Sequence, residues 1–230
     1  MRRTIHKTRH FVNRLPKTGL YLGVFQHTPR KKPFKKPPNF VIIPSMELYR
    51  IDKPFILIIF GASGDLAKLK LFPALYSLIE QKRFQENFYI VGYARTPKSQ
   101  KEFQQEFKES IVKNCPTKVD KKLLNDLSDK VHYFSGQYDK IEDYKKFKDY
   151  LRKLVKKDRL NSKQITKLAY FSVPPVVFKN IIQNLGETKE SPDEDMRLIL
   201  EKPFGEDTHS ATDLFHFVAR YFDEDSIYLL

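Results

Sequence analysis

Two glycines, Gly61 and Gly64, follow the continuous apolar run Phe55–Phe60. Gly61 permits a tight turn, and Gly64 permits a phosphate group to approach the backbone closely. A helix that begins just after them would direct free N–H groups and the positive end of its dipole at an anion. The spacing therefore predicts a phosphate-binding turn, with a glycine turn that merely reverses the chain as the alternative. The dinucleotide fingerprint has a third small residue, for which Ala67 is the candidate.

Arg95 stands at the end of the second predicted strand, where an NAD-selective site usually carries Asp or Glu. A guanidinium group can pair with a 2′-phosphate through two hydrogen bonds, and the hydroxyl of Thr96 can add a donor. The alternative is a solvated arginine after a strand. Because Arg95 follows a predicted phosphate-binding turn, we expect the cofactor to be NADP rather than NAD.

A parallel sheet would bring these residues to one edge. The pattern of apolar runs and amphipathic segments after Met46 predicts such a sheet. Apolar runs predict strands at 55–60, 88–92, 131–134, 167–173 and 196–200. Amphipathic segments predict helices at 65–82, 99–113, 141–156, 176–185 and 207–221. Five alternations of strand and helix predict an α/β fold with a doubly wound parallel sheet of the Rossmann type.

Two of these helices carry expectations of their own. In the first, we expect Leu66, Leu69, Pro73, Tyr76 and the Leu78–Ile79 pair to form the buried stripe. Pro73 lies inside that helix, and we expect it to kink the axis because proline has no N–H to donate. In the helix 176–185, we expect Gly186 to mark the carboxyl end.

The net charge of +14 is concentrated at the amino terminus: residues 1–45 contribute +11 and contain no acidic residue, which leaves +3 for the rest. We therefore expect a basic, disordered or mistranslated extension at 1–45 and one nucleotide-binding domain at 46–230. A targeting peptide and a nucleic-acid-binding tail remain alternatives for the extension, although the scarcity of serine weakens the first. We expect the protein to be cytoplasmic and to have no nucleic-acid or membrane partner.

Other chemistry has little support in the sequence. The single cysteine, Cys115, excludes an internal disulfide or a cysteine cluster for zinc. No apolar run approaches the length of a membrane span. We expect the histidines to be surface or core residues without a carboxylate partner, and we expect no metal site; the six are His6, His10, His27, His132, His209 and His216.

Further motifs occur in an order that resembles one family, the glucose-6-phosphate dehydrogenases. Residues 61–70, which begin with the predicted phosphate-binding turn, resemble the nucleotide-binding turn of the family. Residues 90–95, which end at Arg95, resemble its 2′-phosphate site. Residues 136–139 (GQYD) and 170–175 (YFSVPP) resemble the ends of the family's third and fourth strands, and residues 201–205 (EKPFG) are the most specific match. The resemblance extends from about Phe55 to Tyr228.

The resemblance implies roles for individual residues. Lys202 would contact both NADP and the sugar phosphate, and Pro203 would be a hinge proline between the two sites; on the residues alone, Glu201 and Lys202 read instead as a surface ion pair. The cofactor-binding residues that it implies are Gly61, Ala62, Ser63, Gly64, Asp65, Leu66, Ala67, Lys68, Lys70, Arg95 and Lys202.

The family oxidises glucose 6-phosphate to 6-phosphogluconolactone in the pentose phosphate pathway with NADP, using a histidine base. That base belongs to a C-terminal α+β domain that this sequence lacks. We therefore expect a truncated, split or frameshifted chain that binds NADP but is inactive without a complementing polypeptide. A stand-alone NADP-binding or sensing module is the alternative, and an apolar edge at 227–230 argues against it.

Overall fold

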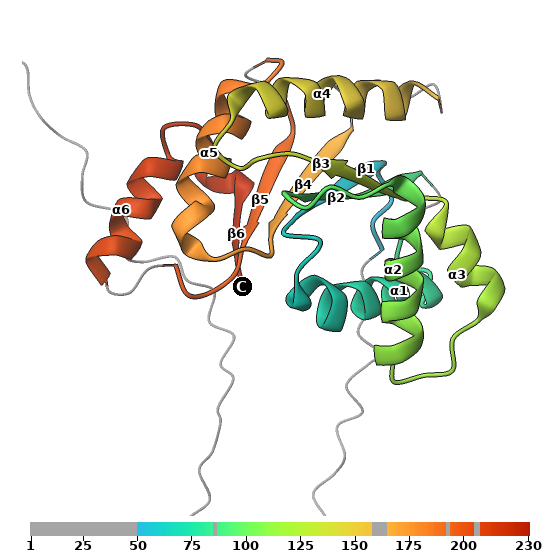
Figure 1. Ribbon diagram of the computed structural model, residues 1–230. Coiled ribbons are helices and arrows are strands. Elements are labelled where there is room, and N and C mark those ends of the chain that lie inside the picture. The colour runs from blue at the N-terminus through green and yellow to red at the C-terminus, as the bar shows by residue number, and fades with distance from the viewer. Residues whose placement is uncertain (1–49, 85–86, 158–164, 192–193, 205–207) are drawn as a thin grey trace, which may run out of the picture. The chain divides into compact units, whose positions relative to one another are not determined.

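The computed structural model describes residues 50–84, 87–157, 165–191, 194–204 and 208–230. All of them belong to the unit Ser45–Leu230. The predicted extension 1–45 lies outside the described residues. Six parallel strands form one sheet in the order β3-β2-β1-β4-β5-β6 (Figure 1). The strands are β1 (Phe55–Phe60), β2 (Phe88–Ala94), β3 (Val131–Ser135), β4 (Thr166–Phe171), β5 (Met196–Leu200) and β6 (Ile227–Leu229). The strand order reverses between β1 and β4, as a doubly wound sheet requires.

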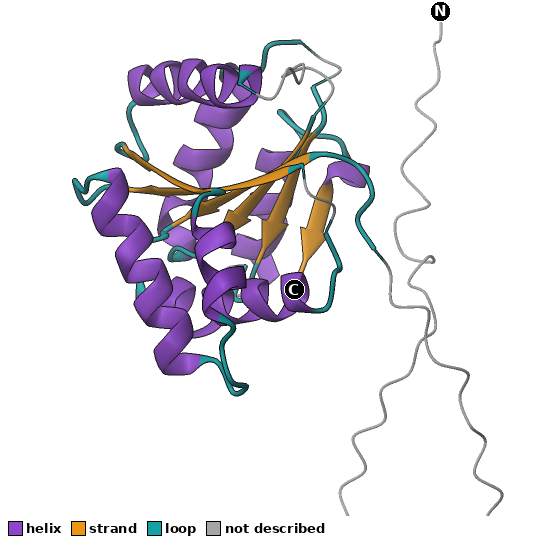
Figure 2. Cartoon of the chain, turned by 90° about the vertical axis from the view of Figure 1, so that its right-hand side faces the viewer, coloured by secondary structure: helices purple, strands orange, loops and turns teal. Residues whose placement is uncertain are grey.

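Helices cover both faces of the sheet (Figure 2). One face packs against η1 (Ala67–Leu71), α1 (Phe72–Glu80), α2 (Gln100–Asn114) and α3 (Lys121–Ser128). The other face packs against α4 (Ile141–Lys156), α5 (Phe178–Glu187) and α6 (Thr208–Val218), and short 3₁₀ turns occur at η2 (Pro175–Val177) and η3 (Glu224–Ser226). The predicted α/β Rossmann-type fold is confirmed. None of the helices in the described ranges is long and apolar enough to cross a bilayer.

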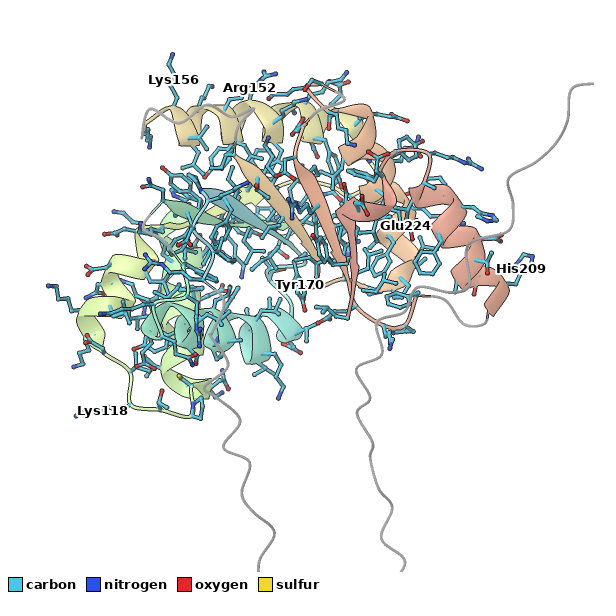
Figure 3. The ribbon with its side chains drawn as sticks, turned by 180° about the vertical axis from the view of Figure 1, so that it is seen from behind. Lys118, Arg152, Lys156, Tyr170, His209 and Glu224 are labelled. Atoms are coloured by element: carbon cyan, nitrogen blue, oxygen red, sulfur yellow. The ribbon has the colours of Figure 1, made fainter. Side chains whose placement is uncertain are left out.

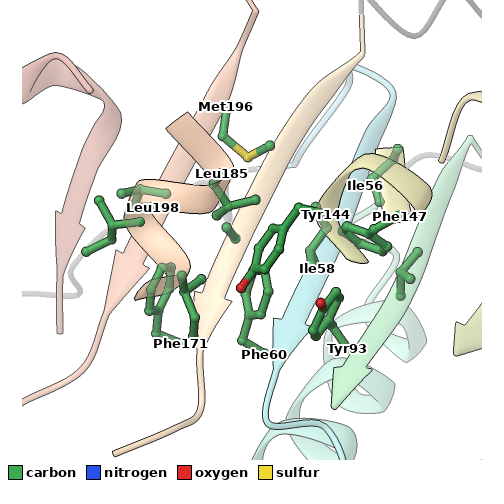
Figure 4. Close-up of a cluster of buried hydrophobic side chains, with 14 of the residues drawn as sticks. Ile56, Ile58, Phe60, Tyr93, Tyr144, Phe147, Phe171, Leu185, Met196 and Leu198 are labelled. Atoms are coloured by element: carbon green, nitrogen blue, oxygen red, sulfur yellow. The ribbon is translucent and has the colours of Figure 1, made fainter. Parts of the chain in front are cut away.

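The central strand β1 is buried on both faces, which explains its continuous apolar sequence. Ile58 and Phe60 point to the face covered by α4, where they meet Tyr144 and Phe147 (Figure 4). Ile59 points to the opposite face. Because both layers of helices pack on this strand, the turn after it is held between two cores.

The helix after the turn departs from the predicted form. It begins at Asp65, and Ala67–Leu71 form a π-helical stretch in which the Phe72 N–H donates to the Ala67 carbonyl. Pro73 then lies at the start of α1, where its missing N–H costs little. The expected kink inside one helix is therefore replaced by a change from π-helical to α-helical geometry.

The predicted apolar stripe of this helix is also wrong in part. Leu66, Leu69 and Leu78 are 39%, 49% and 39% exposed. Of the predicted stripe, Pro73 and Tyr76 are buried as expected, and the buried face also contains Ala67, Phe72 and Leu75. The wider π-helical turn rotates the later residues relative to a regular helix, so a stripe drawn at one constant period points the wrong way.

The end of α5 and the helix α3 also differ from the prediction. The helix α5 continues through Gly186 to Glu187. A Cβ on Gly186 would lie 2.5 Å from the Tyr221 ring. Gly186 therefore permits close packing and does not end the helix. The helix α3 was absent from the prediction, whereas β6 lies within the segment 227–230 that was expected to form an apolar edge. The strand β6 pairs with β5, and its apolar edge is exposed as expected, with Leu229 and Leu230 47% and 59% exposed.

Candidate cofactor site at the carboxyl ends of the strands

The turn after β1 has the tight geometry that its glycines predict. Gly61 has φ +85°, a conformation that favours glycine, and its N–H donates to the Tyr93 carbonyl at 2.9 Å. A Cβ at this position would lie 2.1 Å from the Ser172 carbonyl oxygen. The Gly64 N–H donates back to the Gly61 carbonyl at 2.9 Å. The turn is thereby joined to β2 on one side and packed against the end of β4 on the other.

The residues that follow the turn divide into buried and accessible ones. Ala62 and Ala67 are fully buried, so they serve the packing beneath the turn. Ser63 is half-buried, whereas Gly64, Asp65 and Leu66 are exposed. The N–H groups in the first turn of a helix have no acceptor within that helix. The exposed start of this helix can therefore offer N–H donors and a positive dipole end to an anion.

Arg95 lies beside the turn because β1 and β2 are neighbours, with Phe60 in register with Tyr93. Its side chain is exposed, and the guanidinium carbon lies 5.3 Å from the centre of the Tyr138 ring. This cation–π contact holds the guanidinium group beside the Tyr138 ring. Burial raises the pKa of the Tyr138 hydroxyl, while the charge of Arg95 opposes that increase.

The loop after Arg95 is fixed by a second tyrosine. The Tyr133 hydroxyl donates to the Thr96 carbonyl at 2.5 Å. Burial raises the pKa of Tyr133 to about 12, so the phenol remains protonated and keeps donating at neutral pH. The two residues predicted to recognise a 2′-phosphate, Arg95 and Thr96, therefore lie in a loop held at both the backbone and the side chain.

Lys68 and Lys70 occupy different environments. Lys68 Nζ lies 3.0 Å from Glu106 Oε2 on α2, and the same carboxylate binds Lys98. Lys70 is exposed. Sequence reasoning missed both Glu106 and Lys98, because a contact between a helix and the loop before it leaves no periodic signal. The ammonium group of Lys68 is therefore engaged in an ion pair with α2.

The segment after β5 brings a third group of residues to the same edge. Glu201 accepts a hydrogen bond from the hydroxyl of Tyr170 on β4, and no ion pair joins Glu201 to Lys202 within the described part of the chain. Lys202 is exposed, and its N–H donates to the Leu230 carbonyl at 3.1 Å. The Lys202–Pro203 peptide bond is cis. The simple reading of Glu201 and Lys202 as a surface ion pair is therefore incorrect.

These segments enclose an open cleft of about 370 Å³. Its walls come from residues 64–66 after the turn, 171–175 after β4 and 201–203 after β5, together with Phe178. The cleft lies beside the point where the strand order reverses, between β1 and β4. Ligands of open α/β sheets bind in this position, outside the carboxyl ends of the strands.

The histidines that the structure describes do not line the cleft. His132 is on β3, where it packs against Tyr89 and burial lowers its pKa. His209 Nδ1 lies 3.2 Å from Asp213 Oδ2, so the prediction that it has no carboxylate partner was wrong. Figure 3 shows His209 at the outer end of α6 and Tyr170 below the middle of the sheet. His6, His10 and His27 fall outside the described residues, and within the described ranges no His, Cys, Asp and Glu residues cluster as metal ligands.

Comparison with known proteins adds an independent observation. Residues 58–230 match the family model described as glucose-6-phosphate dehydrogenase, NAD binding domain. A glucose-6-phosphate 1-dehydrogenase of Chlamydia pneumoniae is 37% identical over 185 residues, which cover 78% of this chain and 36% of the relative. A probable glucose-6-phosphate 1-dehydrogenase of Schizosaccharomyces pombe is 36% identical over 171 residues, with 74% and 35% covered.

Solved structures show the same likeness. A glucose-6-phosphate dehydrogenase in complex with its substrate glucose-6-phosphate superposes with a TM-score of 0.71 and 31% identity over 79% of this chain and 37% of that chain. The enzyme from Mycobacterium avium superposes with a TM-score of 0.66 and 28% identity, covering 77% and 36%. The chain therefore spans about a third of the length of the relatives that it matches.

Proposed function

The chain belongs to the glucose-6-phosphate dehydrogenase family, and from that premise we propose that its described domain binds NADP. The position of Arg95 carries the proposal. Arg95 follows β2 directly beside the glycine turn, and no carboxylate occupies the position that would accept from the ribose hydroxyl of NAD. A guanidinium group there favours a 2′-phosphate, which it can bind through two charge-assisted hydrogen bonds.

The glycine turn would bind the other two phosphates of the cofactor, which form its pyrophosphate. Gly61 allows the chain to turn sharply, and a Cβ on Gly64 would meet only the Gly61 carbonyl, at 3.2 Å. The space above Gly64 is thus open to a ligand. The exposed N–H groups at the helix start would bind the pyrophosphate, and Arg95 would bind the adenosine 2′-phosphate one strand away.

We extend the proposal to the reaction of the family, the oxidation of glucose 6-phosphate at C1. Bound NADP would supply the hydride acceptor, its nicotinamide ring. Lys202 lies in the same cleft as Gly64 and Leu66, so its ammonium group can contact both the cofactor and an anionic sugar phosphate. Pro203 would hold Lys202 at the border of the two sites. We propose that the general base lies in a part of the enzyme that corresponds to the remaining two thirds of the relatives, in the same polypeptide or in a complementing one.

Isothermal titration of the full chain with NADP and with NAD tests the cofactor assignment. We expect NADP to bind at least about 10-fold more tightly, because two charge-assisted hydrogen bonds contribute about 1.5–3 kcal/mol. Equal affinities, or no binding of either cofactor, would contradict the proposal. Raising the salt concentration should weaken NADP more than NAD, since an accessible charge pair is screened.

A further inference from the structure

Ser172 has an unusual environment at the end of β4. The residue is only 9% exposed, and its hydroxyl has no hydrogen-bond partner within the described residues. Its backbone is well placed, since the N–H donates to the Phe60 carbonyl at 2.9 Å. Its carbonyl lies against Gly61. The backbone of Ser172 is therefore joined to the end of β1, while its hydroxyl has no partner among the described residues.

A buried hydroxyl without a partner is rare, because leaving water without forming a new hydrogen bond is unfavourable. Ser172 is the only such side chain among the residues that the structure describes. Asn184, by contrast, donates to the Tyr138 carbonyl at 3.0 Å, and Glu194 lies 2.9 Å from Lys167. Ser172 differs from these in position as well, because it lines the 370 Å³ cleft. A partner for its hydroxyl can therefore come from a ligand in that cleft.

The strand order indicates which part of a dinucleotide would reach Ser172. The turn at Gly61 follows the central strand β1, Arg95 follows β2 on one side, and Ser172 follows β4 on the other. A cofactor with its pyrophosphate at the turn and its 2′-phosphate at Arg95 must extend its other half over β4. Ser172 would thus lie next to the nicotinamide nucleotide half, on the same side as Lys202.

We propose that Ser172 is a positioning residue for the cofactor, whose hydroxyl hydrogen-bonds an oxygen of the nicotinamide nucleotide half of NADP. This inference rests on the proposed function, because it requires NADP in the cleft. A ribose hydroxyl or a phosphate oxygen is a suitable partner, since a serine hydroxyl both donates and accepts. The hydrogen bond would fix the nicotinamide half beside Lys202, with no direct role for Ser172 in the chemistry.

The variant Ser172→Ala in the full chain tests the inference with two ligands. NADP carries both halves of the cofactor, whereas adenosine 2′,5′-bisphosphate carries only the adenosine half that Arg95 would bind. We expect Ser172→Ala to bind NADP about 5-fold more weakly, the effect of losing one hydrogen bond. Its affinity for adenosine 2′,5′-bisphosphate should stay within about 2-fold of the unaltered chain, because the adenosine half lies on the other side of the turn.

The midpoint of thermal unfolding, measured on the variants without ligand, distinguishes a ligand-binding role of the Ser172 hydroxyl from a structural one. Removing a hydroxyl that has no partner should leave the midpoint unchanged or raise it, whereas removing a satisfied one should lower it. Ser128→Ala is the matched control, because Ser128 is 2% exposed on α3 and does not line the cleft. This control should bind both ligands as the unaltered chain does.

The possible outcomes are distinct. Unchanged NADP affinity in Ser172→Ala would overturn the inference. An equal loss for NADP and adenosine 2′,5′-bisphosphate, or a lowered midpoint, would also overturn it, because Ser172 would then act through the fold of the turn. If the unaltered chain bound neither ligand, the proposed function itself would fail, and the inference with it. Weaker NADP binding with unchanged bisphosphate binding supports the proposal.

Discussion

The carboxylate of Glu106 accepts hydrogen bonds from the Lys98 ammonium group at 2.5 and 2.6 Å, one to each oxygen. The same carboxylate forms an ion pair with Lys68 at 3.0 Å. Lys68 belongs to η1 after the phosphate turn, and Lys98 belongs to the loop that carries Arg95. A single acidic residue on α2 therefore connects the segment that would bind the pyrophosphate of the cofactor with the segment that would bind its 2′-phosphate.

Glu106→Gln should make the stability of the domain less dependent on pH. Burial alone would raise the pKa of Glu106, but hydrogen bonds from Lys98 and Lys68 outweigh it, and the net pKa is lowered. A lowered pKa in the folded state means that the ionised form adds stability above about pH 4.5, and that this stability is lost as the pH falls through the folded pKa. We expect the variant to lose about 1 kcal/mol at pH 7 and progressively less toward acid pH.

Urea unfolding of both proteins at several pH values between 7 and 4 measures this difference. Glu109→Gln is the control, because Glu109 is on the same helix and accepts a hydrogen bond only within it, from Gln105. Its effect should stay below about 0.5 kcal/mol at every pH. A loss for Glu106→Gln that stays constant from pH 7 to pH 4 would show that the ionised carboxylate is not the source of the stability.

Gly61→Ala and Gly64→Ala should separate folding from binding. Alanine at position 61 would adopt an unfavourable positive φ and place its Cβ 2.1 Å from the Ser172 carbonyl, so we expect a loss of about 2–4 kcal/mol. Alanine at position 64 meets only the Gly61 carbonyl at 3.2 Å and should cost less than about 1 kcal/mol. It should nevertheless weaken NADP, because the Cβ points into the space that the pyrophosphate would fill.

Thermal unfolding combined with NADP titration tests this pair. The prediction is contradicted if Gly64→Ala destabilises the domain as much as Gly61→Ala, or if it leaves NADP affinity unchanged.

Much of this fold could be predicted from the sequence because its signals are local. The apolar run of β1, the glycines after it and Arg95 at the next strand end lie within short segments, and they identify without tertiary information the edge where we propose that the cofactor binds. The helix α3 also had a local signal that the prediction did not use. The Asp120 side chain caps its first turn by accepting from the Lys122 and Leu123 N–H groups.

The remaining features depend on contacts that sequence periodicity does not encode. The π-helical stretch before Pro73 changes which later residues face the sheet, and both Leu66 and Leu69 are exposed. The Glu106 ion pairs join separate elements through space. Ser172 looks like any serine after a strand until its burial and its missing partner are known.

Glu194→Gln should destabilise the domain strongly without changing the cleft. Glu194 lies 2.9 Å from Lys167, and both side chains are about 5% exposed or less. Removing the carboxylate leaves a buried ammonium group without this partner, which typically costs about 3–5 kcal/mol. The pair lies at the amino ends of the strands, because Lys167 is the second residue of β4, so the affinity of the folded protein for NADP should not change.

Urea unfolding gives the stability and titration gives the affinity. Glu142→Gln is the control: it removes an exposed pair with Lys145 and should cost less than about 0.5 kcal/mol. A small loss for Glu194→Gln, comparable to that of the control, would show that the buried pair adds little to the stability of the domain.

The most direct test of the account compares NADP and NAD binding by the unaltered chain and by Arg95→Ala. We predict that NADP affinity falls about 10- to 100-fold while NAD affinity changes by less than about 2-fold, because only NADP has the 2′-phosphate that Arg95 would bind. Arg152→Ala removes one positive charge from α4, far from the cleft lining, and should change neither affinity. Equal losses for NADP and NAD in Arg95→Ala, or an unchanged NADP affinity, would contradict the assignment of Arg95 as the residue that selects NADP.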